Sequence, residues 1–213
     1  MKALLSFSVF SLFALAASAQ LNAGSWLTGG SLKYDASKSD ENNTKNSEFK
    51  FNPQTFYTFN NHWGFGGGIN FDYSNDKTTN PTSETKTMTS TYGLAPGVRY
   101  YENISKSVSC YGQGNLFYDL GSTKVTTTVS GNSTESKSNI SEYGAYLTPG
   151  IMWNAKSNLF LDFNWGSLRY DSQITKPEDS DTKYKDNEFK LSVNPFCICV
   201  GMYYSFGNGV AAE

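Results

Sequence analysis

The stretch FKFNPQTFYTFNNHWGFGGGINFDYS, residues 49–74, contains two alternating segments joined by the short polar turn Asn60-Asn61-His62. Before the turn, Phe49, Phe51, Tyr57 and Phe59 share one parity. Lys50, Asn52, Gln54 and Thr58 share the other. A period of two places successive side chains on opposite faces of an extended chain. The stretch therefore predicts a β-hairpin with one apolar and one polar face.

The same pattern recurs through the chain and predicts eight strands, each long enough to cross a bilayer as a tilted strand of about 9–11 residues. We expect them at residues 25–36, 48–59, 63–74, 88–101, 107–120, 140–153, 158–171 and 188–206. Every second strand carries one proline, namely Pro53, Pro96, Pro149 and Pro195. An even number of consecutive hairpins can close on itself, which leaves no unpaired sheet edge.

The connections between these strands sort into two kinds. Three tight turns are expected at one end, at residues 60–62, 102–105 and 154–157. Four polar loops are expected at the other end, at residues 37–47, 75–86, 121–138 and 172–187. This alternation predicts an up-and-down meander with both chain termini at the tight-turn end. Short turns on one side and long loops on the other are typical of outer-membrane barrels.

Alternation alone does not decide which face looks outward. A soluble lipid carrier turns its apolar face inward, whereas a membrane barrel turns it outward. The polar face combines glycines with charges, as a narrow interior requires, and the apolar face carries aromatic residues near the turns: Phe59, Trp63, Tyr100, Trp153 and Phe206. These match an interfacial girdle and favour the membrane. Near Pro195 the apolar residues of the eighth predicted strand switch from one parity to the other, which predicts a β-bulge. In the fifth predicted strand, Gly112 and Gly114 fall on the apolar parity, so its outward face is ambiguous.

Residues 1–19 read as a signal peptide, with Lys2, an apolar run and a cleavage site between Ala19 and Gln20. Residues 20–213 are then expected to form a single barrel domain. The 17 basic and 19 acidic residues leave a net charge of −2, which gives no reason to expect a nucleic-acid partner. A mean hydropathy of −0.46 and the lack of a second long apolar run argue against membrane-spanning helices.

The leader ending in SAQ, the proline-containing strands NPQTFY, APGVRY and TPGIMW, and the aromatic close MYYSF resemble the outer-membrane protein β-barrel domain family. Its simplest members are similar to OmpX and the OmpA transmembrane domain. The resemblance covers nearly the whole mature chain and implies an eight-stranded antiparallel up-and-down transmembrane β-barrel in the outer membrane of a Gram-negative bacterium. It also implies extracellular loops and periplasmic termini. One departure is that Phe206, the aromatic close, is followed by residues 207–213.

The best candidates for a site are charged residues on the inward face: Lys33, Lys50, Asp72, Arg99, Asp119, Glu142 and Asp162. Lys33, Lys50 and Asp72 are expected at similar heights on neighbouring strands, and Arg99 and Asp162 nearer the turns, facing each other across the lumen. We interpret the set as charge pairs that fill the interior and satisfy its polar groups. The alternative is a gated ion path or a ligand clamp.

No catalytic, metal-binding or cofactor-binding residue can be nominated. The single histidine, His62, lies in a tight turn, and no serine or threonine has a histidine–acid partner. The three cysteines are expected to be small packing residues; Cys197 and Cys199 share a face, which is poor geometry for a disulfide.

These features predict a non-catalytic, monomeric outer-membrane barrel with a structural or surface-interaction role. Its expected partners are outer-membrane lipids, including lipopolysaccharide, and an extracellular molecule at the loops, which could extend the strands or be solvated connectors. A narrow, low-conductance pore is the alternative, and a lipid A-modifying enzyme is a third hypothesis. An eight-stranded interior is filled by side chains, which disfavours a diffusion porin.

Overall fold

The computed structural model describes residues 23–39, 43–156, 158–164, 166–193 and 199–206, and the elements it contains are all strands. They are β1 Ser25–Ser39, β2 Thr44–Thr58, β3 Trp63–Thr79, β4 Ser83–Asn103, β5 Val108–Val129, β6 Asn132–Lys156, β7 Leu159–Asn164, β8 Gly166–Pro177, β9 Tyr184–Val193 and β10 Cys199–Phe206. All the pairings between them are antiparallel, which confirms the predicted fold class. Within these residues, no helix is long and apolar enough to cross a membrane.

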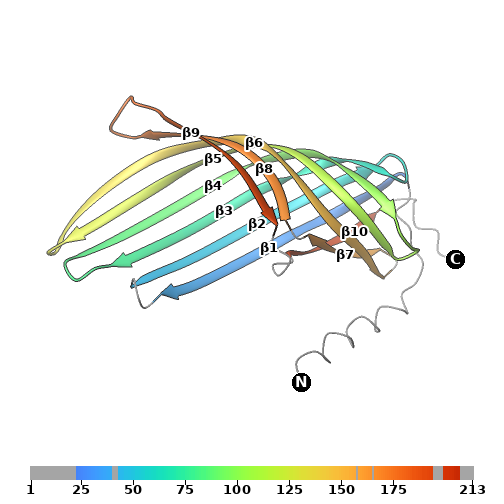
Figure 1. Ribbon diagram of the computed structural model, residues 1–213, viewed down its shortest axis with the longest axis horizontal. Helices are drawn as coiled ribbons and strands as arrows, with labels where there is room; N and C mark the ends of the chain where they lie inside the picture. The colour runs from blue at the N-terminus through green and yellow to red at the C-terminus, as the bar shows by residue number, and fades with distance from the viewer. Residues whose placement is uncertain (1–22, 40–42, 157, 165, 194–198, 207–213) are drawn as a thin grey trace, which may run out of the picture.

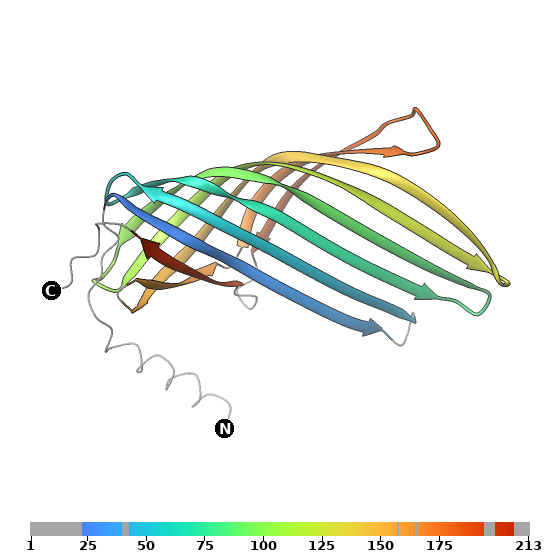
Figure 2. The same ribbon diagram turned by 180° about the vertical axis from the view of Figure 1, so that it is seen from behind.

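The strands form a ring at the end where the tight turns lie. Each strand from β1 to β6 pairs with the next one along the chain, so that β6 pairs with β7. β7 then pairs with β10, and β10 pairs with β1. The closing pairing places Trp26 opposite Phe206, so the first and last described strands meet at this end. Figures 1 and 2 show β1 to β6 as one curved wall, with β7 and β10 beside its tight-turn end.

The last two predicted strands are each divided into two segments. Residues 158–171 become β7 and β8, and residues 188–206 become β9 and β10. Asn164 pairs with Cys199, but Gly166, two residues on, pairs with Val193, so the register changes between the segments. Pro195 and the predicted bulge beside it lie outside the described residues, as do the signal sequence, its cleavage site and residues 207–213.

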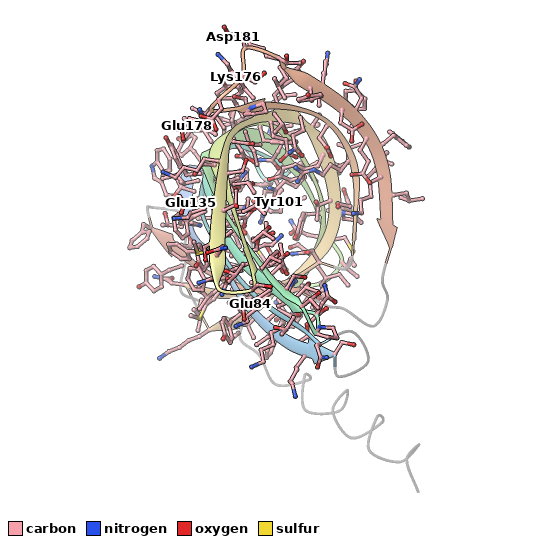
Figure 3. The ribbon with its side chains drawn as sticks, turned by 90° about the vertical axis from the view of Figure 1, so that its left-hand side faces the viewer. Glu84, Tyr101, Glu135, Lys176, Glu178 and Asp181 are labelled. Atoms are coloured by element: carbon pink, nitrogen blue, oxygen red, sulfur yellow. The ribbon has the colours of Figure 1, made fainter. Side chains whose placement is uncertain are left out.

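At the opposite end, which we call the hairpin end, β8 takes the place of β7 beside β6, and β9 pairs with β8. Among the described residues, no pairing joins β9 to the second half of β1. Both ribbon views show the β8–β9 hairpin bending away from the wall, and Figure 3 shows the ring seen from the hairpin end. The ring is therefore closed by pairing at the tight-turn end and has a seam at the hairpin end.

The prediction of long loops is wrong. The strands continue through most of the predicted loop residues, and the described residues that still connect them at this end are 43, 80–82, 130–131 and 178–183. The physical reason is clearest in residues 75–86 and 121–138, which are rich in threonine, whose branched β-carbon favours strands. Ser130 and Gly131 have φ of 51° and 86°, so two residues with positive φ reverse the chain between β5 and β6. This is the geometry that two-residue hairpin turns prefer.

The apolar faces of the strands lie on the outside of the ring. On β4, Leu94 is 63% exposed while Ala95 is 1% exposed, and this alternation recurs on the other strands. Four of the five predicted girdle residues, Phe59, Trp63, Tyr100 and Phe206, are exposed, whereas the fifth, Trp153, is half-buried. On the ambiguous fifth strand, Gly112 is exposed, and Tyr111, Gln113 and Asn115 are buried inside.

Pro53, Pro96 and Pro149, the prolines of the predicted strands that lie within described strands, each lie opposite a glycine of the preceding strand. The pairs are Gly30 with Pro53, Gly67 with Pro96, and Gly112 with Pro149. At Gly67, φ is 156° and an added Cβ would lie 2.5 Å from the carbonyl oxygen of Ala95. Glycine at this position allows the neighbouring backbone to approach the strand closely.

We predict that Gly67→Ala destabilises the folded barrel by about 1–3 kcal/mol, because the new Cβ meets backbone and the conformation is strained. The matched control is Gly112→Ala, since nothing lies within 4 Å of the Cβ position there. Its expected change is within about 0.5 kcal/mol. Urea unfolding in detergent micelles, followed by tryptophan fluorescence, measures both; equal destabilisation of the two variants would contradict the explanation.

Candidate functional site in the barrel interior

The inward faces of five strands meet near the tight-turn end around one arginine. Arg99 comes from β4, and its side chain is 1% exposed. It contacts residues from strands on both sides and across the ring: Phe56 on β2, Tyr111 and Gln113 on β5, Asp162 on β7 and Tyr203 on β10. These side chains point inward because they share the parity opposite to the exposed apolar face. We call this group the Arg99 cluster.

Hydrogen bonds and an ion pair hold the guanidinium of Arg99 in place inside the barrel. Its Nε donates to Oε1 of Gln113 at 2.9 Å, and its Nη2 donates to the hydroxyl of Tyr203 at 3.1 Å. Its Nη1 lies 3.4 Å from Oδ2 of Asp162, and Oδ1 of the same carboxylate accepts a hydrogen bond from the Tyr111 hydroxyl. The Tyr203 hydroxyl donates to Oε1 of Gln54 on β2 at 2.9 Å. The network therefore crosses the interior from β4 to β10 and back to β2.

Aromatic rings enclose the same guanidinium. Its Cζ lies 4.3 Å from the centroid of the Tyr111 ring, 4.6 Å from that of Phe56 and 5.0 Å from that of Tyr203. Cation–π contacts of this kind contribute about 2 kcal/mol when they are desolvated. The rings belong to a buried cluster at this end: Leu27, Phe56, Tyr101, Tyr111, Met152, Phe160 and Tyr203. Figure 3 shows Tyr101 within the ring of strands.

The neighbouring polar residues satisfy backbone groups that a proline leaves unpaired. In the β4–β5 ladder, Leu94 pairs with Tyr118 and Gly97 with Asn115, so the register skips Ala95 and Pro96. Proline has no N–H to donate to a ladder. The side-chain amide of Asn115 donates to the carbonyl oxygen of Ala95 at 2.9 Å.

A second inward cluster lies nearer the hairpin end. Arg169 on β8 forms ion pairs with Glu142 and with Asp171, the latter at 2.9 Å, and its Cζ lies 4.3 Å from the centroid of Phe117. Asp119 accepts a hydrogen bond at 3.0 Å from the side-chain amide of Asn70. We call this the Arg169 cluster.

Three more of the candidate residues form a row near the hairpin end. Lys33 pairs with Lys50 across β1 and β2, and Lys50 pairs with Asp72 across β2 and β3. The Nζ atoms of Lys33 and Lys50 each lie 2.8 Å from an oxygen of Glu48. The strand register thus places these residues at neighbouring heights, and a carboxylate not nominated from the sequence lies between the two cations.

The two clusters border a polar cavity of about 440 Å³ in the lumen. Its walls include Lys50, Asp72, Arg99, Asp162 and Arg169. The seven candidate residues are therefore distributed among three groups: Arg99 with Asp162, Glu142 with Asp119 near Arg169, and Lys33, Lys50 and Asp72.

Sequence reasoning missed Arg169 and the aromatic shell. In the predicted seventh strand the apolar residues Leu159, Leu161 and Phe163 are at odd positions, and this parity would assign Arg169 to the outward face. Tyr170 is 49% exposed, so the apolar parity has changed from odd to even positions, and that change is the signal. Phe56 and Tyr111 carry no charge that would single them out as candidate site residues.

The described residues contain no group of three or more histidine, cysteine, aspartate or glutamate side chains arranged to hold a metal ion. Cys110 is a free, half-buried thiol, and the side chains of Cys197 and Cys199 lie outside what the structure describes. His62 is in the turn after β2, where its Nδ1 lies 3.0 Å from the carbonyl oxygen of Tyr101.

Comparison with known proteins gives one family and several similar structures. Residues 5–194 match the model of the outer membrane protein beta-barrel domain. The crystal structure of OprG from Pseudomonas aeruginosa is 16% identical, with coverage of 88% of this chain and 98% of that chain and a TM-score of 0.44. The crystal structure of Ail from Yersinia pestis is 19% identical, with coverage of 87% and 100% and a TM-score of 0.35. No curated protein matches the sequence.

We predict that Arg99→Met destabilises the barrel by about 3–5 kcal/mol, because it leaves the buried Asp162 carboxylate without its cation. Adding Asp162→Asn should recover most of this loss while keeping an acceptor for Tyr111. The control is Lys50→Met, whose side chain is 38% exposed and whose loss should cost less than about 1 kcal/mol. Urea unfolding measures all three; a double variant no more stable than Arg99→Met would contradict the pairing.

Proposed function

The chain belongs to the outer membrane protein beta-barrel domain family and is an outer-membrane protein, and we propose that its barrel conducts no solute and serves a structural or surface-interaction role without catalysis. The observation that carries this proposal is the Arg99 cluster. Its hydrogen bonds cross the ring of strands where that ring is closed by pairing, and its aromatic residues fill the space around the guanidinium.

The position of the cluster supports a blocked interior. β4 and β10 lie opposite each other in the ring, with four pairings between them in either direction. Arg99 and Tyr203 bridge these two strands directly. Eight strands enclose an interior just wide enough for side chains to fill. A passage would require the cluster to separate, which exposes a buried cation.

The hairpins support a role at the surface. β5 continues through Thr126, Thr127 and Thr128 to the turn at Ser130 and Gly131, and β6 begins at Asn132. Residues 132–137 of β6 pair with β5 but with no other described strand, so they present side chains and a backbone edge to a partner. We propose that the hairpin end faces the cell exterior and that the termini lie on the periplasmic side, as in outer-membrane barrels with short periplasmic turns.

A second candidate, a narrow passage for small cations, is favoured by the lumen itself. The described residues of the cavity wall and the Arg169 cluster together contain five carboxylates and three cations, the cations being Lys50, Arg99 and Arg169. The carboxylates are Asp72, Asp119, Glu142, Asp162 and Asp171. An acidic lining concentrates cations. This passage would still end at the Arg99 cluster, so we rank it second. A lipid A-modifying activity has no supporting observation, since the only histidine lies at the opposite end from the hairpins.

We predict that the wild-type protein gives no conductance steps in a planar bilayer. Replacing the three side chains that bridge the ring, in Arg99→Ala/Tyr111→Ala/Tyr203→Ala, should open a lumen and produce steps. The control is Lys33→Ala, which changes an inward charge away from the cluster. Heat-modifiable mobility of each variant on a gel checks folding. Wild-type steps that vanish when Arg99 or Asp162 is changed would support the pore instead.

We predict further that Ser130→Cys, at the tip of the β5–β6 hairpin, reacts with a membrane-impermeant maleimide on intact cells. His62→Cys, in a turn at the other end, should react only after the outer membrane is opened. The unmodified chain, which contains Cys110, provides the background. Labelling of His62→Cys but not Ser130→Cys on intact cells would reverse the proposed orientation.

A further inference from the structure

The outward face carries a ring of lysines toward the hairpin end, and we propose that this ring binds the phosphate groups of outer-leaflet lipids. Each of β1 to β6, β8 and β9 contributes one lysine, on the same parity as its exposed apolar residues. The lysines are Lys38, Lys45, Lys77, Lys86, Lys124, Lys137, Lys176 and Lys185. We call this set the lysine belt. Its proposed ligand rests on the membrane orientation proposed above.

The strand register aligns the belt. Lys38 lies opposite Lys45, Lys45 opposite Lys77, and Lys77 opposite Lys86. Lys124 lies opposite Lys137 in the next hairpin. Like charges directly opposite each other on one face destabilise a sheet. The repeated arrangement therefore indicates an external anion that offsets the repulsion.

Carboxylates of this chain neutralise only part of the belt. Lys77 pairs with Glu84 and Lys124 with Glu135, each at 2.7 Å, and Lys176 pairs with Asp181 at 3.1 Å. Lys137 also lies 3.8 Å from Glu135. The hydrogen bond from Lys124 lowers the pKa of the Glu135 carboxyl, which keeps it charged.

Three belt lysines, Lys45, Lys86 and Lys185, form no ion pair among the described residues. Lys45 and Lys86 lie on either side of Lys77 in the strand register. Glu84 and Glu135 lie at the outer rim in Figure 3, and Lys176 and Asp181 on the β8–β9 hairpin. Most carboxylates of these strands, such as Asp72, face the lumen instead. The outside of the hairpin end is thus basic and the inside acidic.

The height of the belt matches a lipid head-group layer. Exposed outward tyrosines mark the end of the apolar face on several strands, including Tyr73 on β3, Tyr92 on β4 and Tyr143 on β6. The belt lysine of each of these strands lies four or six residues farther toward the hairpin end. At about 3.3 Å per residue and a strand tilt of about 40°, this places the belt about 10–15 Å beyond the tyrosines.

Aromatic residues mark the membrane–water interface, and lysine side chains reach from above it toward phosphates. A circumferential belt suits lipids, which surround a barrel on all sides, better than a soluble partner, which contacts one side. Each basic residue close to an anionic membrane surface strengthens binding to it. The structure therefore favours a phosphate-bearing lipid head group as the ligand.

The test compares lipid A, which bears phosphates, with its dephosphorylated form, each titrated into the folded full-length protein in non-ionic detergent. We expect the wild type to bind lipid A at least about tenfold more tightly than the dephosphorylated lipid. Lys45→Gln/Lys77→Gln/Lys86→Gln should weaken binding of lipid A by about tenfold or more. The same three positions changed to arginine should retain the affinity.

The matched control is Lys33→Gln/Lys50→Gln/Lys190→Gln, which removes the same total charge from inward positions on β1, β2 and β9. It should bind lipid A as the wild type does. Equal affinity for the two lipids, or equal losses in the belt and control variants, would overturn the proposal. Heat-modifiable mobility confirms that each variant is folded. Lipid affinity in detergent is independent of conductance and of labelling on cells, so failure here is distinguishable from failure of the proposed function.

Discussion

Backbone hydrogen bonding in a hydrocarbon environment constrains this structure more than any side-chain contact does. Each unsatisfied N–H or C=O group in a bilayer costs several kcal/mol, so a sheet that spans it must pair both edges of every strand. The pairing of β1 with β10 meets this requirement at the tight-turn end, where Trp26 lies opposite Phe206. Pro53, Pro96 and Pro149 are tolerated because each lies opposite a glycine. Beside Pro96, the Asn115 amide also donates to the carbonyl of Ala95.

Closure of the ring also determines what the interior contains. A narrow ring brings inward side chains from opposite strands into contact, so they must fill space and satisfy one another. Arg99 does both, since its guanidinium donates hydrogen bonds to Gln113 and Tyr203 and packs against aromatic rings. Such a cluster stabilises the barrel and blocks it at once. At the hairpin end, inward side chains are not forced into contact across a closed ring. There the outward face of the strands is predominantly basic and the inward face predominantly acidic.

Much of the fold could be predicted from the sequence because alternation with a period of two is a local signal. The outward exposure of Leu94 and the burial of Arg99 both follow from it. The lengths of the hairpins could not be predicted, because threonine-rich polar segments fit a loop and a solvated strand equally well. The site was predicted in part: parity assigned Asp162 to the interior, but the irregularity near residue 165 concealed Arg169. Contacts across the ring, such as Arg99 with Tyr203, depend on strand curvature and register, which no local pattern encodes.

The central claim is that lipid chains contact the outward apolar face, and spin-label accessibility tests it most directly. Labels at Leu94 and Leu116, whose side chains are 63% and 66% exposed, should be accessible to oxygen and shielded from a water-soluble nickel complex in reconstituted bilayers. A label at the inward Thr91 should not show this lipid signature. Free access of the nickel complex to Leu94 and Leu116, with shielding at Thr91, would show that the apolar face is not in lipid.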